Sequence, residues 1–210
     1  MLFLLVSGML LAQEPAGGEI DLLPPPDFAG WTRIGIPAST PLHPSSPWSV
    51  RGRVLHCQGD QAGHEMLRYD RELGDFLLSV EWRLAPRDGT PRYNSGILVR
   101  NTKEGDLWHQ AQIGAPENAG FFFYVTLIDG AQQRVNLKQQ RRPVTIHPPG
   151  EWNRYEIRAT GCRLSLLVNG QPASELEDCA LRRGWMGLEA EGYEIEFRNL
   201  RLRETASSAN

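Results

Sequence analysis

Cysteine is scarce in this chain, and its few cysteines lack the spacing of a metal site. The 210 residues include three cysteines, Cys57, Cys162 and Cys179, without a Cys-x-x-Cys pair. That pattern excludes a structural zinc site held by thiolates. Two interpretations of the thiols stay open: a disulfide between Cys162 and Cys179 in an exported protein, with Cys57 buried, or three small buried side chains.

An excess of positive charge is also lacking. Lysine and arginine total 22 against 25 aspartate and glutamate residues, so the formal net charge is −3. A nucleic-acid-binding protein needs a basic field, and we therefore expect no nucleic-acid partner. The densest basic run, residues 138–142, lies among polar residues and is typical of a solvated loop.

Only one long apolar run is present, at residues 1–11, where Ser7 and Gly8 are the exceptions. A membrane-spanning helix needs about 20 apolar residues, so we expect no membrane span. The run resembles a secretory signal, which predicts a signal peptide at residues 1–12 and a periplasmic or extracellular protein. Residues 13–27, rich in proline and glycine, predict a tether before one domain at residues 28–203 and a C-terminal tail at 204–210.

Helix-period patterning is nearly absent, and short strand-like runs take its place. Turn residues separate the runs, with hairpin signals at Thr160-Gly161 and Asn169-Gly170. So many short strands in one domain predict an all-β fold, a β-sandwich of two antiparallel sheets. The eleven predicted strands are 48–50, 53–58, 65–68, 76–84, 95–100, 108–113, 121–127, 154–160, 162–169, 185–191 and 195–202.

Residues 76–84 alternate apolar and polar side chains. Val80 and Trp82 fall on one face, and Glu81 and Arg83 fall on the other. A sandwich buries one face of each sheet, so the second face is free to carry a polar working surface. The same alternation places five further polar residues on the face opposite their apolar neighbours. If their strands are adjacent in one sheet, these residues converge with Glu81 and Arg83 on one face. These residues are Arg100, Gln110, Gln112, Glu189 and Glu191.

The five histidines show no metal-ligand spacing. His109 falls on the predicted buried face, which favours a core histidine, and the other four are scattered along the chain. The sequence therefore assigns no metal ion and no cofactor.

Short strings run in a characteristic order through the chain. They are Gly74-Asp75-Phe76 with Glu81-Trp82-Arg83, Asn94-Ser95-Gly96-Ile97 with Arg100, Gln112-Ile113, Pro149-Gly150-Glu151-Trp152-Asn153, Leu167-Val168-Asn169-Gly170, and Gly187-Leu188-Glu189 through Gly192 to Phe197-Arg198-Asn199-Leu200-Arg201-Leu202. Together they resemble the 3-keto-disaccharide hydrolase family over residues 28–203. The resemblance implies a concanavalin A-like jelly roll whose concave sheet holds carbohydrate. Two positions depart from the family pattern, since Gln110 replaces a usual glutamate and Glu191 replaces a usual histidine.

The resemblance implies a reaction at a glycosidic bond, for which the polar set offers candidates. Two carboxylates can cleave such a bond, one protonating the leaving oxygen and the other acting as nucleophile or base. In a 3-keto sugar the ketone acidifies the hydrogen on C2, so elimination needs one base and a donor that stabilises the enolate. We predict Glu81 as the base, Arg100 as its electrostatic partner and Glu189 as a further catalytic carboxylate.

Five residues are predicted to bind the sugar. Amides and carboxylates on a concave surface suit sugar hydroxyls, and Trp108 or Tyr93 at an edge suits stacking on a pyranose face. The expected partner is an oligosaccharide or glycoside substrate. The predicted substrate-binding residues are Asn94, Trp108, Gln110, Gln112 and Glu191.

Three alternatives stay open. Half-exposed strands commonly alternate in this way, so a cross-strand ion pair also explains Glu81 and Arg100. A carbohydrate-binding module without catalysis would use the same face, and the departures at Gln110 and Glu191 favour it. A protein-adhesion domain needs an exposed apolar patch, for which residues 121–124 are the candidate, although a core strand explains them better.

Overall fold

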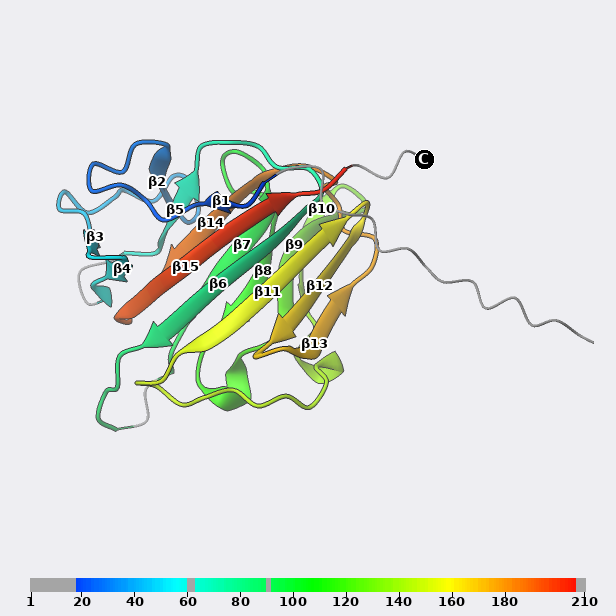
Figure 1. Cartoon of the computed structure of the whole chain (residues 1–210). Coiled ribbons are helices and arrows are strands. Elements are labelled where there is room, and N and C mark those ends of the chain that lie inside the picture. The colour runs from blue at the N-terminus through cyan, green and yellow to red at the C-terminus, as the bar shows by residue number, and fades with distance from the viewer. Residues whose placement is uncertain (1–17, 60–62, 90–91, 207–210) are drawn as a thin grey trace, which may run out of the picture.

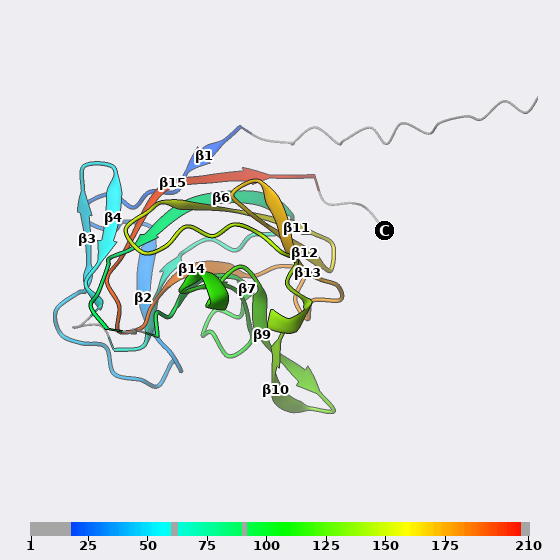
Figure 2. The ribbon, with the colours of Figure 1, turned by 90° about the horizontal axis from the view of Figure 1, so that it is seen from below.

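The computed structural model describes residues 18–59, 63–89 and 92–206, and its regular structure is almost entirely β (Figure 1). Two antiparallel sheets stack as layers, which confirms the predicted jelly-roll sandwich (Figure 2). In order of pairing, sheet A contains β13 (Gln171–Leu176), β12 (Arg163–Val168), β11 (Asn153–Thr160), β6 (Phe76–Leu84), β15 (Ile195–Glu204), β4 (Val54–Cys57) and β3 (Trp48–Arg51), and β1 (Ile20–Asp21) pairs with β15. Sheet B contains β10 (Ala131–Asn136), β9 (Phe122–Ile128), β8 (Trp108–Ile113), β7 (Ser95–Asn101), β14 (Trp185–Ala190), β5 (Glu65–Tyr69) and β2 (Trp31–Gly35). Two short 3-10 helices, η2 (Pro116–Asn118) and η3 (Lys138–Gln140), lie in the connections.

The core lies between the two sheets. Every second residue of β6 is buried, including Val80 and Trp82, whereas the residues between them are partly exposed. Ile97, Ala111 and Leu188 fill the core from the side of sheet B. However, β7, β8 and β14 are buried along almost their whole length, on both faces. The outward face of sheet B is therefore shielded from solvent along these three strands, unlike that of sheet A.

Most predicted strands are confirmed. Strands β6 and β8 span the predicted residues 76–84 and 108–113. The hairpins β11–β12 and β12–β13 form at the predicted turns, with Asn169 and Gly170 in the left-handed region at φ 50° and 79°. The sequence pattern misses β1, β2, β10 and β13. Strand β10 is polar and exposed, and β13 contains Pro172 at an edge of sheet A, so neither shows the usual strand pattern.

The predicted tether is wrong over its second half. Ile20 and Asp21 form β1 and pair with β15. Leu22 is buried, and its backbone N–H donates to the Leu200 carbonyl at 2.9 Å. Apolar residues among the prolines thus anchor the chain to sheet A, and the domain includes residues before position 28. The predicted signal peptide at residues 1–12 lies outside the described residues.

A β-bulge between β7 and β14 overrides the alternation at Arg100. The register shifts between Trp185 and Gly187, and Arg100 lies beside this shift with φ 49°. Its side chain is fully buried, and Nη2 donates to Asp75 Oδ1 at 2.8 Å, just before β6 of sheet A. The expectation that Arg100 joins the polar outward set is therefore wrong, because a bulge reverses side-chain direction along a strand.

All three cysteines are free thiols, and Cys57 and Cys179 are buried. The backbone N–H of Cys179 donates to the Cys162 carbonyl at 2.7 Å, so the two chain segments are adjacent without a disulfide. Within the part of the chain that the structure describes, no helix has the length and apolar content needed to cross a bilayer.

Candidate functional site

Glu189 and Glu191 stand at the end of β14, on the face of sheet B that points away from sheet A. Their neighbours Leu188 and Ala190 belong to the hydrophobic core, so alternation directs the glutamates outward. Strand β5 pairs with β14 in antiparallel register, and His64 immediately precedes β5. The three side chains His64, Glu189 and Glu191 come together at this point, and we call them the His–Glu cluster.

The cluster is closely spaced and only partly open to solvent. His64 Nε2 lies 2.8 Å from Glu189 Oε1 and 3.7 Å from Glu191 Oε2. The Glu189 side chain is 5% exposed, whereas those of His64 and Glu191 are 36% and 37% exposed. Glu189 is therefore the buried floor of the cluster, and the other two side chains line its opening.

Gly96 lets a residue of β8 reach the cluster across β7. Strand β7 lies between β8 and β14, and a Cβ on Gly96 would lie 2.2 Å from Gln110 Nε2. Because glycine has no Cβ, Gln110 crosses β7 and donates from Nε2 to Glu189 Oε2 at 2.5 Å. The contact between Gln110 of β8 and Glu189 of β14 thus depends on a single glycine in the strand between them.

Asn94 and Gln112 hold the second carboxylate. Asn94 Nδ2 donates to Glu191 Oε2, and Asn94 Oδ1 accepts from Gln112 Nε2 at 2.6 Å. Gln112 Nε2 also lies 3.2 Å from the Ser95 carbonyl, which fixes its amide over the sheet. Asn94 therefore turns its N–H group toward Glu191, and Gln112 orients the Asn94 amide.

The surroundings raise the pKa of two members of the cluster. Burial raises the pKa of Glu191, and the adjacent Glu189 charge adds to this effect. For His64, burial opposes protonation, but the hydrogen bond and charge of Glu189 and the charge of Glu191 outweigh burial, and the pKa is raised. The cluster thus favours holding protons or another positive charge.

The cluster opens into a groove across sheet B. One cavity of about 100 Å³ contains the cluster, and a second of about 260 Å³ adjoins it. The two cavities share Ile36, His64, Trp108 and Arg134 in their walls. Trp108 contacts Phe123 in a T-shaped pair, with the ring centroids 5.2 Å apart. An aromatic side chain, amides and carboxylates along one groove suit a ligand with both apolar ring faces and hydroxyl groups.

The structure brings together six of the predicted site residues around one cavity. They are Asn94, Trp108, Gln110, Gln112, Glu189 and Glu191. Tyr93 lies elsewhere, stacked on Tyr193 at 5.1 Å, so Trp108 is the aromatic residue of the groove. Sequence reasoning misses His64 and Arg134. His64 precedes its strand without any ligand spacing, and Arg134 lies on β10, which the pattern does not reveal.

Glu81 does not converge with this set. It lies on β6 of sheet A and faces solvent, where Oε2 accepts from Arg198 Nε at 2.7 Å and Oε1 accepts from Asn199 at 2.9 Å. Burial opposes ionisation of Glu81, but these hydrogen bonds and the Arg198 charge outweigh it and lower the pKa. The expectation that Glu81 shares a face with Glu189 is wrong. Alternation along a strand decides on which face of its sheet a residue lies, but it does not decide which of the two sheets the strand joins.

His109 is a core histidine, as expected. It is fully buried on β8, and Nδ1 lies 3.3 Å from the Arg100 carbonyl. Burial lowers the pKa of His109 to about 4, despite its contacts with backbone carbonyls. A neutral imidazole on the core side of β8 contributes to packing and not to the groove.

A jelly-roll sandwich with a groove of amides and carboxylates on one sheet is typical of carbohydrate-active β-sandwich proteins. Residues 18–203 match the family described as a 3-keto-alpha-glucoside-1,2-lyase-like domain, and the chain belongs to this family. The resemblance that the sequence strings indicate is thereby confirmed. Among curated proteins, no match is found.

Solved structures with a similar fold include proteins described as carbohydrate-binding or glycosyl hydrolase, at low sequence identity. The carbohydrate binding module CBM66 from Bacillus subtilis is 15% identical, with a TM-score of 0.61 over 83% of this chain and 96% of that chain. A putative glycosyl hydrolase from Parabacteroides distasonis is 17% identical, with a TM-score of 0.60 over 90% and 100% of the two chains. A β-glucanase from Bacillus licheniformis is 10% identical, with a TM-score of 0.55 over 91% and 100%. These likenesses establish the jelly-roll fold.

Proposed function

We propose that this protein cleaves the glycosidic bond of a 3-keto-disaccharide or a related oxidised glycoside in the groove of sheet B. The observation that carries the proposal is the His–Glu cluster, where a buried carboxylate, a second carboxylate and an imidazole meet beside Trp108. The family description supports the oxidised sugar as substrate class.

Elimination suits the geometry better than hydrolysis by two opposed carboxylates. A two-carboxylate mechanism places its groups on either side of the scissile bond. Glu189 and Glu191 project from one face of one strand and both approach His64 Nε2, within 2.8 and 3.7 Å. They therefore meet a bound sugar from the same side, as a base and its supporting groups would.

The elimination needs one base and one stabilising group. The base takes the proton from C2, the C2–H electrons form the C1=C2 bond, and the C1–O bond breaks as the leaving oxygen gains a proton. Positive charge beside the C3 ketone oxygen stabilises the enolate character of the transition state. We assign the base to Glu191, the more exposed carboxylate, and the positioning of His64 to Glu189, which contacts it at 2.8 Å.

A carbohydrate-binding module without catalysis is the second candidate. Gln110 places an amide where the family pattern usually has a glutamate, and amides bind sugar hydroxyls without transferring protons. The similar fold of the binding module CBM66 agrees with this candidate.

Product release from a panel of 3-keto-disaccharides and their unoxidised parents tests the proposal. We expect cleavage of the keto sugars alone, with a conjugated enone product that absorbs in the ultraviolet. The Glu191→Gln variant should lose about 10²- to 10⁴-fold in kcat, as expected for a missing general base. Saturable binding of the same sugars without any cleavage would instead establish the binding module, and equal cleavage of the unoxidised parents would exclude the ketone-dependent mechanism.

A further inference from the structure

We propose that His64, Glu189 and Glu191 bind one divalent transition-metal cation, such as Mn²⁺ or Zn²⁺, in the groove of sheet B. The His64 nitrogen and one oxygen of each glutamate all lie within 4.8 Å of one another. Metal–ligand bonds of about 2.1 Å place neighbouring ligand atoms roughly 3 to 3.5 Å apart, so small rotations of these side chains complete the site. One imidazole with two carboxylates suits Mn²⁺, Zn²⁺ or Fe²⁺ better than Ca²⁺, which prefers oxygen ligands alone.

A second His–Glu pair in the same protein shows what the cluster lacks. On sheet A, His56 Nδ1 lies 3.1 Å from Glu196 Oε1, and Arg83 Nε donates to Glu196 Oε2 at 2.6 Å. That carboxylate is therefore neutralised by a guanidinium. In the described part of the chain, no lysine or arginine forms an ion pair with Glu189 or Glu191. Two carboxylates in a partly buried groove face one imidazole, and Arg134 acts on Glu191 only through its charge, without an ion pair in the described residues. A cation bound directly to both carboxylates would balance their negative charge.

The residues around the cluster support metal binding. Gln110 holds Glu189 through Oε2 at 2.5 Å, and Asn94 holds Glu191, also through Oε2. Metal-binding carboxylates are commonly oriented by such outer hydrogen bonds. Three protein ligands leave coordination positions open toward the groove, which is typical of catalytic and not of structural metal sites.

The cation gives the proposed reaction its stabilising group. Coordination of the C3 ketone oxygen polarises the carbonyl, acidifies the C2 hydrogen and stabilises the developing enolate. This step rests on the proposed function, whereas the metal site itself rests only on the cluster. Each carboxylate needs one oxygen for the metal, so the other oxygen of Glu191 remains available to the C2 proton.

Equilibrium dialysis tests the site without reference to catalysis. Purified protein is stripped with a chelator, dialysed against Mn²⁺ or Zn²⁺ in separate experiments, and its bound metal is measured by elemental analysis. We expect one ion per chain, with affinity at least 10-fold lower in His64→Gln and in Glu189→Gln. The matched control is Glu196→Gln, which removes the carboxylate of the other His–Glu pair and should keep the metal. Circular dichroism verifies that each variant is folded.

The outcomes separate the metal site from the proposed function. Binding of no metal, or equal binding by wild type and both cluster variants, would overturn the site even if keto sugars are cleaved. Stoichiometric binding that the cluster variants lose, in a protein that cleaves no sugar, would support the site and count against the proposed function. If both proposals hold, chelation abolishes cleavage and added Mn²⁺ or Zn²⁺ restores it.

Discussion

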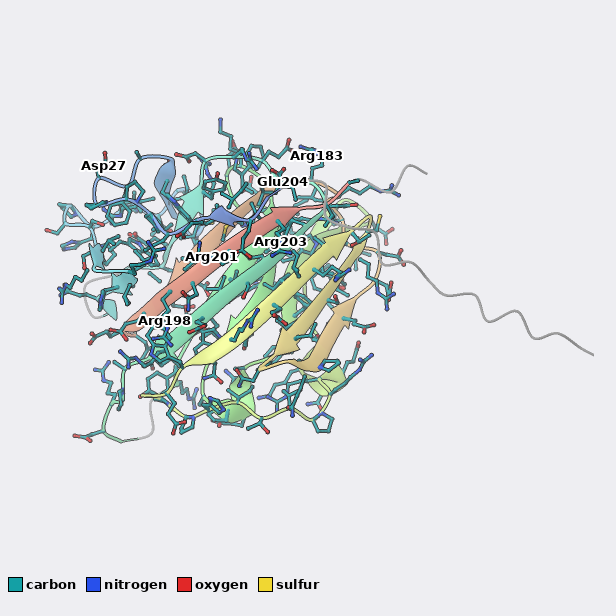
Figure 3. All side chains as sticks on the ribbon, in the orientation of Figure 1. Asp27, Arg183, Arg198, Arg201, Arg203 and Glu204 are labelled. Atoms are coloured by element: carbon teal, nitrogen blue, oxygen red, sulfur yellow. The ribbon has the colours of Figure 1, made fainter. Side chains whose placement is uncertain are left out.

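The outward faces of sheet A and sheet B both carry charged side chains at alternating positions, but the charges have different partners. On sheet A, Glu81 pairs with Arg198 and Glu196 pairs with Arg83, and the face is open to solvent. Figure 3 shows Arg198, Arg201 and Arg203 along β15 on this open face. On sheet B, Glu189 is buried among amides and an imidazole, without an arginine partner within the described residues. Exposed ion pairs contribute little energy, whereas a buried carboxylate without a lysine or arginine partner is costly and indicates a site.

The aromatic residues of the two faces differ in the same way. The guanidinium groups of Arg83 and Arg198 lie over the ring of Trp152, 4.6 and 3.9 Å from its centroid, so this ring already contacts two cations of the protein. Trp108 contacts Phe123 with the two rings nearly perpendicular, and it lines both cavities of the groove. An aromatic side chain that lines a cavity thus occurs on sheet B, beside the His–Glu cluster.

The largest expected difference between the two sheets separates the two His–Glu pairs. Glu189→Gln should lower kcat/KM for a keto sugar by about 10³-fold, because it removes the charge that positions His64 and balances the proposed cation. Glu196→Gln should stay within about 3-fold of wild type, since its carboxylate lies on sheet A. Steady-state kinetics of the two variants measure this difference. Comparable losses in both would show that the faces do not differ in function.

Arg100→Met tests whether the inward-turned arginine is structural. Breaking its buried ion pair with Asp75 leaves an uncompensated charge, and we expect a loss of roughly 3 to 5 kcal/mol in the free energy of unfolding. Adding Asp75→Asn should recover part of this loss. Denaturant unfolding measures both variants. Unchanged stability together with lost activity would instead indicate that Arg100 takes part in the reaction.

His109 should make the core side of sheet B sensitive to acid. Its pKa is about 4 in the folded protein and about 6.5 in the unfolded chain, so the unfolded state binds the proton more tightly. The stabilisation is complete above pH 6.5 and is lost as the pH falls toward 4, and the difference corresponds to roughly 3 kcal/mol. His109→Asn keeps a donor near the Arg100 carbonyl and should flatten this part of the pH–stability curve. Thermal melts between pH 4 and pH 7 provide the measurement, and parallel curves for the two proteins would contradict the assignment.

Gly96→Ala should damage the groove with little effect on the fold. The new Cβ would lie 2.2 Å from Gln110 Nε2 and displace the amide that holds Glu189. We expect a loss of about 10- to 100-fold in kcat/KM, with a change of about 1 kcal/mol in stability. Gly18→Ala is the matched control, because no atom lies within 4 Å of its added Cβ. Full activity in Gly96→Ala would show that the Gln110–Glu189 contact is dispensable.

The smallest expected effect is that of Glu81→Gln. The sequence predicts Glu81 as the catalytic base, whereas we propose Glu191, and this variant distinguishes the two. Its carboxylate pairs with Arg198 on the solvent face of sheet A, so activity should stay within about 2-fold and stability within about 1 kcal/mol. Kinetics and unfolding of one purified variant measure both quantities. Loss of cleavage in folded Glu81→Gln protein would place the reaction on sheet A.

The strands and the faces of their residues were largely determined by the sequence. Alternation with a period of two is local, so the outward positions of Gln110, Gln112, Glu189 and Glu191 follow from their apolar neighbours. The turn at Asn169-Gly170 follows from backbone chemistry, because asparagine and glycine tolerate positive φ.

Only the tertiary structure decided which of these residues share a site. Strand pairing joins segments distant in the chain, as when β5 meets β14 and brings His64 to Glu189, and no local pattern encodes that meeting. Pairing also assigned β6, with Glu81, to sheet A and β8, with Gln110, to sheet B. A bulge in the β7–β14 ladder turned Arg100 into the core. Side-chain direction is set within a few residues of backbone, whereas sheet membership, register and bulges depend on the packing of the whole sandwich.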